Sequence, residues 1–278
     1  MTRDFYFFSA VLFCAISLTV AAFFPYLQSL VGAWNSEEYG HGYFIPVLSF
    51  LIGWNILAEK KPVTRPSWAG IIVIIIGFSF LTLAELSAFE PPAHYGLILC
   101  IAGLFLSFFG VQYTKAIAFP LIYLFFCIPL PRLIQVSLSS EMQLMSSTLG
   151  VVILQTLGVS VFQEGNIIDL GHQKLQVVEA CNGLRYLFPF MSLSFLVAFL
   201  FQGSLWKRAI IFLSSVPITI FMNSARIAWV GILVNWKGPS MAEGIVHDLQ
   251  GWTVFAACLI ILFIDSTKST ILKSKKQT

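Results

Sequence analysis

A cysteine in a short polar segment is the residue of this chain best suited to carry out chemistry. Cys181 lies in residues 179–185, with the order Glu-Ala-Cys-Asn-Gly-Leu-Arg, directly before a long apolar run. If that run begins a helix, free N–H groups and the positive end of the helix dipole lie beside the sulfur and favour the thiolate. Arg185 follows one helical turn later and adds positive charge. We expect a thiol with a lowered pKa that attacks a carbonyl carbon.

Two further polar groups occur in or next to later apolar runs. Arg226 belongs to the segment Asn-Ser-Ala-Arg at 223–226, inside an apolar run. Because a guanidinium within a membrane span is costly, we interpret Arg226 as functional by default. His247 stands before the last apolar run, next to Asp248, which can orient its ring. Thiol acyl transfer needs a cation to stabilise the oxyanion and an acid to protonate the departing amine. Cys181, Arg226 and His247 are our candidates for these roles.

These candidates also have structural interpretations. Arg226 could instead form an ion pair with Glu179 or Asp248. Asn223, one turn away, could position the guanidinium or form an interhelical hydrogen bond. Cysteines inside apolar runs are interpreted as small packing residues, namely Cys14, Cys100, Cys127 and Cys258.

The composition indicates that lipid surrounds most of the chain. Of its 278 residues, 58% are hydrophobic and only 10% are charged, which is too apolar for a water-soluble domain. Apolar runs of helix length recur, and the alternating pattern of a membrane β-barrel is absent. We predict an all-α polytopic membrane protein that forms one integral membrane domain over residues 1–278. No spacing of Cys and His predicts a metal site, and no cofactor is expected.

About eight apolar runs are candidates to cross a hydrocarbon layer of roughly 30 Å. They cover residues 5–24, 43–58, 68–86, 95–111, 115–130, 184–201, 209–234 and 252–267. The first could be a signal peptide, but it lacks a small-residue cleavage pattern. The distribution of Lys and Arg places both termini in the cytoplasm.

The longest stretch between runs, residues 131–182, is then an insertion on the outer side. Residues 133–157 have apolar positions at helical spacing, which predicts an amphipathic helix at the interface or a buried re-entrant helix. Residues 159–163, 167–170 and 174–178 are predicted to form short strands of a small β-element that leads to Cys181.

The predicted topology brings the three candidates to one depth. Cys181 lies at the outer end of the sixth span, and His247 lies in the last outer loop. From the cytoplasmic Arg208 to Arg226, a helix rises roughly 25 Å, most of the way to the outer interface. The thiol, guanidinium and imidazole should therefore meet at the outer face.

At these residues the chain resembles the exosortase family, part of the archaeosortase/exosortase superfamily of membrane cysteine transpeptidases. The segments that carry the resemblance follow the family's order along the chain: 34–42, 179–185, 223–226 and 247–252. The resemblance implies an enzyme of the inner membrane whose partners are exported proteins with a C-terminal sorting signal. That signal consists of a Pro-Glu-Pro-like (PEP-CTERM) motif, a transmembrane helix and a basic cluster.

The resemblance also implies roles for the site residues. Cys181 would form an acyl-thioester, Arg226 would donate a proton or stabilise the oxyanion, and His247 would support the transition state. Because arginine keeps its proton far above neutral pH, we expect an electrostatic role for it. Asn182 stands where many relatives have Ser, and it keeps a polar side chain near the substrate carbonyl.

Some functional questions stay open at this level. Tyr39 and His41 could line the substrate entrance, or they could form a structural turn. The acceptor of the acyl group could be water, a lipid amine or a polysaccharide. A small-solute transporter with an anion site at Arg226 is one alternative function, and a non-catalytic component of a polysaccharide or secretion assembly is another. Nucleic acid is not an expected partner.

Overall fold

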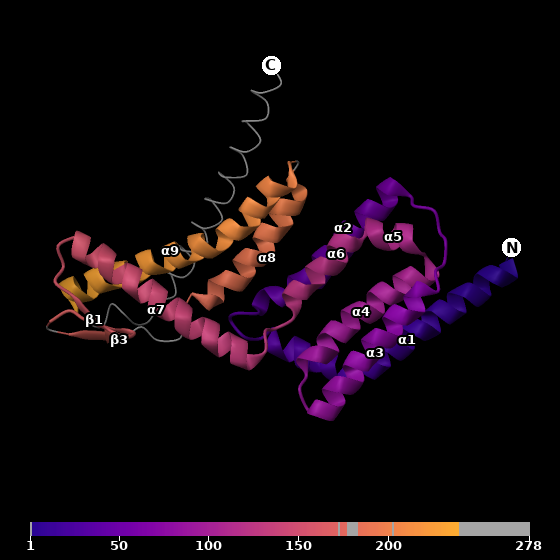
Figure 1. Cartoon of the computed structure of the whole chain (residues 1–278), viewed down its shortest axis with the longest axis horizontal. Helices are drawn as coiled ribbons and strands as arrows, with labels where there is room; N and C mark the ends of the chain where they lie inside the picture. The colour runs from indigo at the N-terminus through magenta and orange to yellow at the C-terminus, as the bar shows by residue number, and fades with distance from the viewer. Residues whose placement is uncertain (1, 172, 177–182, 202, 239–278) are drawn as a thin grey trace, which may run out of the picture. The chain divides into compact units, whose positions relative to one another are not determined.

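The computed structural model describes residues 2–171, 173–176, 183–201 and 203–238. The chain divides into two compact units, Met1–Pro131 and Arg132–Thr278, and each is described by itself (Figure 1). Five described helices are long and apolar enough to cross a membrane, or six if Ala118–Cys127 and Arg132–Thr156 form one broken span. The predicted helical membrane fold with a small sheet is confirmed, but the number of eight spans is not. The run expected at 252–267 lies outside the described residues.

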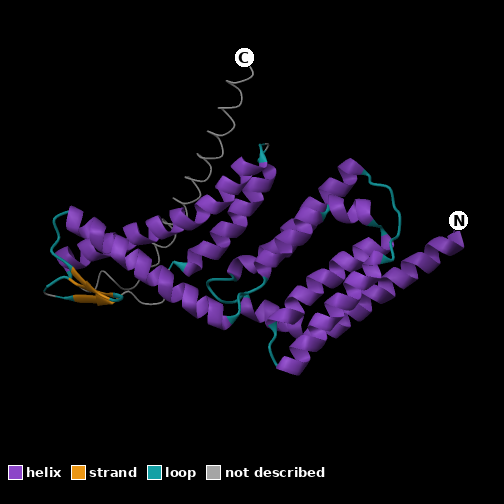
Figure 2. Ribbon diagram, viewed as in Figure 1, coloured by secondary structure: helices purple, strands orange, loops and turns teal. Residues whose placement is uncertain are grey.

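The first unit consists of helices and connecting loops (Figure 2). Its elements are α1 (Thr2–Ala33), the 3-10 helix η1 (Gly40–Tyr43), α2 (Phe44–Lys60), α3 (Ala69–Ser87), α4 (Pro91–Phe108), α5 (Val111–Ala116), α6 (Ala118–Tyr123) and the 3-10 helix η2 (Leu124–Cys127). Helices α3 and α4 approach closely because glycines face each other. A Cβ at Gly77 would lie 2.5 Å from Sγ of Cys100, and one at Gly96 would lie 2.5 Å from the carbonyl oxygen of Gly77. Without a driving force from water, such small residues allow membrane helices to pack.

The continuous span expected over 115–130 is replaced by three short pieces. Helix α5 ends at Ala116, and α6 begins at Ala118. Pro120 lacks the N–H that would bond to the carbonyl of Ala116 in an uninterrupted helix, which explains the break at this point. The hydroxyl of Ser49 on α2 donates to the carbonyl of Pro120 at 2.6 Å and holds α6 against α2.

Aromatic side chains of residues 34–43 satisfy backbone groups beside the two prolines at 129 and 131. Pro131 has no N–H for the carbonyl of Cys127, and the indole Nε1 of Trp34 donates to that oxygen at 2.8 Å. The N–H of Leu130, between the prolines, donates to the hydroxyl of Tyr39 at 3.0 Å. The loop therefore stabilises the end of the 118–130 segment, where unpaired backbone groups would be costly.

The second unit combines three helices with a small sheet. Its elements are α7 (Arg132–Thr156), β1 (Phe162–Glu164), β2 (Ile167–Asp169), β3 (Lys174–Gln176), α8 (Leu184–Leu200) and α9 (Leu205–Lys237). The helix expected at 133–157 is confirmed as α7. The three strands are present, and β1 and β2 are shorter than expected. Residues 177–178, expected to continue β3, lie outside the described residues. Pro189 and Pro217 lie inside α8 and α9, and both helices continue through them.

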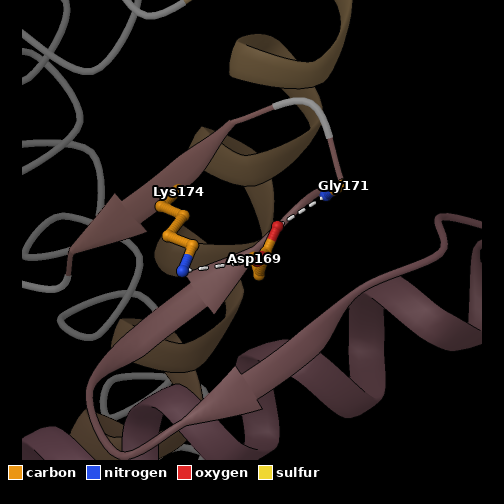
Figure 3. Close-up of polar contacts among 3 residues, drawn as sticks. All are labelled: Asp169, Gly171 and Lys174. Atoms are coloured by element: carbon orange, nitrogen blue, oxygen red, sulfur yellow. Dashed lines mark hydrogen bonds and ion pairs between the residues drawn. The ribbon is translucent and has the colours of Figure 1, made fainter.

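The sheet is antiparallel in the order β1–β2–β3 and packs on α7 and α9. Ile168 of β2 is fully buried in a cluster with Leu154 of α7 and Ile227 of α9. At the turn between β2 and β3, the carboxylate of Asp169 accepts a bond from the N–H of Gly171 at 2.8 Å and lies 3.8 Å from Nζ of Lys174 (Figure 3). This element ends at Gln176, just before the segment that carries Cys181.

Helix α9 is the central element of the second unit, because both α7 and α8 pack along it. Helix α7 runs parallel to α9: Gly150 lies against the carbonyl of Ser224 and the side chain of Ile227, and Leu154 lies against Gly231 further along both helices. Helix α8 is joined to α9 through the hydroxyl of Ser194, which donates to the carbonyl of Ile211 at 2.6 Å.

Candidate functional site

The first turn of α8 is held against both neighbouring helices at Gly183. This residue precedes the helix with φ at +85°, a left-handed conformation that glycine adopts without strain. Its carbonyl accepts the N–H groups of Tyr186 and Leu187, both at 3.1 Å. A Cβ at this position would lie 3.2 Å from Nδ2 of Asn223 and 3.4 Å from Cε of Met142. The start of α8 is therefore fixed directly against α9 and α7.

Helix α9 carries a row of buried polar residues on one face, and this row includes Asn223. Ser215, Thr219, Asn223 and Arg226 follow one another at intervals of four, four and three residues, so they share one face of the helix. All four are buried, and Asn223 is completely inaccessible. The hydroxyls of Ser215 and Thr219 donate to carbonyls of their own helix. Asn223 and Arg226 are thus the members of this face whose polar groups reach beyond α9.

Two guanidinium groups lie near one tyrosine ring at the start of α8. The Cζ atoms of Arg226 and Arg185 are 5.8 Å and 5.9 Å from the ring centroid of Tyr186. An aromatic face attracts cations at this range, most effectively where water is excluded. Arg226 is only 4% exposed, whereas Arg185 is partly exposed. Positive charge therefore concentrates at the helix end that already carries the positive dipole.

Such an arrangement favours negative charge near the first turn of α8. A thiolate or an oxyanion placed there would be stabilised by the guanidinium groups and by the amide N–H groups of the helix end. The structure brings Arg185, Asn223 and Arg226 to this turn. Cys181, Asn182, His247 and Asp248, which the sequence analysis assigns to the same site, lie outside the described residues.

The two candidates from the first unit occupy the loop before α2. Tyr39 is buried, and burial raises the pKa of its phenol to about 12, although the bond from Leu130 opposes this shift. Its hydroxyl is therefore neutral at physiological pH. The ring of His41 stacks on that of Tyr39 with a centroid distance of 6.3 Å. The described contacts of Tyr39 assign it to packing of the loop; they do not test a substrate-binding role.

The sequence analysis assigned no role to two residues of this site, Tyr186 and Met142. Tyr186 follows Arg185 directly, and an aromatic residue between two candidate cations could have been recognised as a cation–π partner. Met142 lies far away in the sequence, and no local pattern predicts its contact with Gly183. Only the packing of α7 on α9 brings it there.

Comparison with known families identifies this architecture. The family model of the transmembrane exosortases, Exosortase_EpsH, matches residues 33–264. The chain belongs to this family. The match covers the four segments that carry the resemblance, 34–42, 179–185, 223–226 and 247–252. No curated protein and no solved structure shows significant similarity to the chain.

Membership of the exosortase family places the chain among membrane transpeptidases that process exported proteins. In the described residues, this agrees with five long apolar helices and with a positively charged site at the start of the shorter apolar helix α8.

Proposed function

We propose that this exosortase cleaves the C-terminal sorting signal of exported proteins through an acyl-thioester on Cys181. The substrate would carry a Pro-Glu-Pro-like motif, a transmembrane helix and a basic tail. The site would face the outer side of the inner membrane, with both termini of the enzyme in the cytoplasm. Substrate recognition would occur laterally, because the signal presents a helix of its own within the bilayer.

The observation that carries this proposal is the packing of Gly183 against Asn223. Cys181 precedes Gly183 by two residues, and two residues of chain span at most about 7 Å. Asn223 lies one helical turn before Arg226, whose guanidinium lies over Tyr186. The short stretch of chain between Cys181 and Gly183 supports a site that the thiol and the buried arginine share.

The reaction divides into two acyl transfers. The thiolate of Cys181 attacks the scissile carbonyl, and the resulting oxyanion is stabilised by Arg226. The C–N bond then breaks, and the departing amine takes a proton, for which His247 is our candidate donor. The acceptor nucleophile attacks the thioester, loses its proton and releases the thiol.

Substitution of Cys181 tests this proposal. Cys181→Ala and Cys181→Ser should leave the protein inserted in the membrane and abolish release of the signal from a reporter protein. Cys14→Ala is the matched control, because Cys14 is an exposed cysteine of α1 in the other unit. Normal processing by Cys181→Ala would refute the proposal. Loss of processing by Cys14→Ala would show that the assay reports insertion and not chemistry.

A further inference from the structure

Two buried hydroxyls on α7 have no role in the account given so far. Ser146 and Ser147 are both 0% exposed, and neither Oγ has a hydrogen-bond partner among the described residues. A buried hydroxyl without a partner destabilises a fold, so native proteins rarely keep one without a reason. Other buried hydroxyls of this unit are bonded: Ser215 donates to the carbonyl of Phe212 at 2.6 Å, and Ser224 donates to that of Ile220 at 2.7 Å.

The register of α7 places both serines beside the candidate site. Met142, one turn before Ser146, reaches Gly183, and Gly150, one turn after it, lies against the carbonyl of Ser224. Residues four apart share a helix face, and Ser147 is three residues before Gly150. The two hydroxyls therefore lie on the part of α7 between its contact with Gly183 and its contact with Ser224, next to Asn223.

Helix packing alone does not require these hydroxyls. Gly150 brings α7 close to α9, and small residues at 146 and 147 permit the same approach one turn earlier. Alanine would serve that purpose equally well, and it would leave no polar atom to satisfy. The hydroxyl oxygens are what remains to be explained.

We propose that Ser146 and Ser147 donate hydrogen bonds to main-chain carbonyl oxygens of the polypeptide substrate, at or next to the scissile bond. This inference rests on the proposed function. A Pro-Glu-Pro-like motif cannot form a regular helix, because proline lacks the N–H and its ring clashes with the preceding turn. Carbonyl groups near the cut therefore have no intrahelical donors when the motif enters a buried site. Each of these groups needs a donor that the enzyme supplies. A hydroxyl donates a hydrogen bond to a neutral carbonyl and adds no buried charge.

Because both serines are fully buried, entry of the substrate requires neighbouring side chains to move. Met142 is 3% exposed, and its Cε lies against the Gly183 position. Methionine is unbranched and changes rotamer easily, so it is suited to cover these groups and to yield to a peptide.

The test uses the full-length enzyme in proteoliposomes with a reporter protein that ends in a Pro-Glu-Pro-like motif, a transmembrane helix and a basic cluster. The double variant Ser146→Ala/Ser147→Ala should lower kcat/KM at least tenfold, with an unchanged or raised thermal midpoint. Thr148→Ala removes an exposed hydroxyl of the same helix, which is already bonded to the carbonyl of Leu144, and should process the reporter like the wild type. A fall in kcat would assign the bonds to the scissile carbonyl, and a rise in KM would assign them to a flanking one.

Two results would overturn the inference. One is wild-type processing by the double variant, at an unchanged or a raised midpoint, which would mean that the hydroxyls do not contact the substrate. The other is a lower thermal midpoint and a loss of processing in the double variant, combined with the same loss in Ser147→Thr, which keeps a hydroxyl. Failure of the proposed function is a separate outcome. In that case Cys181→Ala would process the reporter, and the processing rates of the serine variants could still be compared with that of the wild type.

Discussion

In the loop before α2, aromatic side chains bond to backbone groups beside prolines, whereas at the start of α8 buried polar side chains surround a helix end. Trp34 and Tyr39 have identified backbone partners at Cys127 and Leu130. Asn223 and Arg226 instead lie against Gly183 and the ring of Tyr186. The aromatic residues thus stabilise the fold of the first unit, whereas the buried carboxamide and guanidinium create a local electrostatic environment in the second. The contacts of these side chains therefore distinguish a structural role from an electrostatic one.

The largest effect is expected at the cation of the second unit. Arg226→Gln should lower the rate of reporter processing by about 100- to 1000-fold, the range found when one oxyanion donor is removed. Arg226→Lys should not restore it, because an ammonium lacks the planar fork of the guanidinium. Lys237→Gln, at the exposed end of the same helix, is the control and should process normally. If Arg226→Gln retained more than a tenth of the wild-type rate, the distinction between the two units would fail.

The next effect concerns the contact that positions the first turn of α8. Gly183→Ala adds a Cβ close to the carboxamide of Asn223 and should lower processing by roughly tenfold, in addition to about 1–2 kcal/mol of backbone strain. Gly158→Ala provides a matched control: its φ is +83°, but nothing lies within 4 Å of the added atom. Thermal unfolding and processing of both variants separate strain from contact. Equal losses of processing in the two variants would show that the contact with Asn223 is unimportant.

In the first unit, the expected effect is on stability and not on chemistry. Trp34→Phe leaves the carbonyl of Cys127 without its indole donor and should cost about 1–3 kcal/mol. The fraction that remains folded should process the reporter at the normal rate. Trp68→Phe, at an 85% exposed position, is expected to be neutral. A loss of processing in Trp34→Phe at unchanged stability would instead assign this loop a direct role in processing.

The effect that is smallest at physiological pH is the titration of Tyr39, because it appears only under alkaline conditions. Because burial raises the pKa of Tyr39 to about 12, the neutral phenol favours the folded state below pH 10. That contribution, about 2–3 kcal/mol, should be lost as pH rises from 10 to 12. Tyr39→Phe removes the bond to Leu130 and should be less stable at pH 8 but less sensitive to this rise. Unfolding of both proteins at pH 8, 10 and 11.5 tests the sign.

Sequence patterns were sufficient for the elements whose signals are local. The amphipathic spacing of residues 133–157 predicted α7, and the apolar run with Arg226 predicted α9. The helix start beside Cys181 followed from the change from polar to apolar residues. Proline alone was not a reliable guide to breaks: Pro25, Pro189 and Pro217 lie inside continuous helices, whereas Pro120 accompanies the break between α5 and α6.

The contacts that shape the site could not be predicted, because they connect distant segments. Met142 and Gly183 are far apart in the sequence, and they meet only because α7 and α8 both pack on α9. The partners of Trp34 and Tyr39 lie about ninety residues away in the sequence, next to prolines. Tertiary packing, and not local propensity, decides such contacts.

The most direct test of the central claim is to trap the covalent intermediate. Enzyme mixed with the reporter protein and quenched in acid should contain an adduct whose mass equals enzyme plus the retained part of the reporter. Peptide mapping should place it on Cys181, and hydroxylamine should release it as expected for a thioester. Processing that proceeds without any adduct, or with an adduct on another cysteine, would contradict the account.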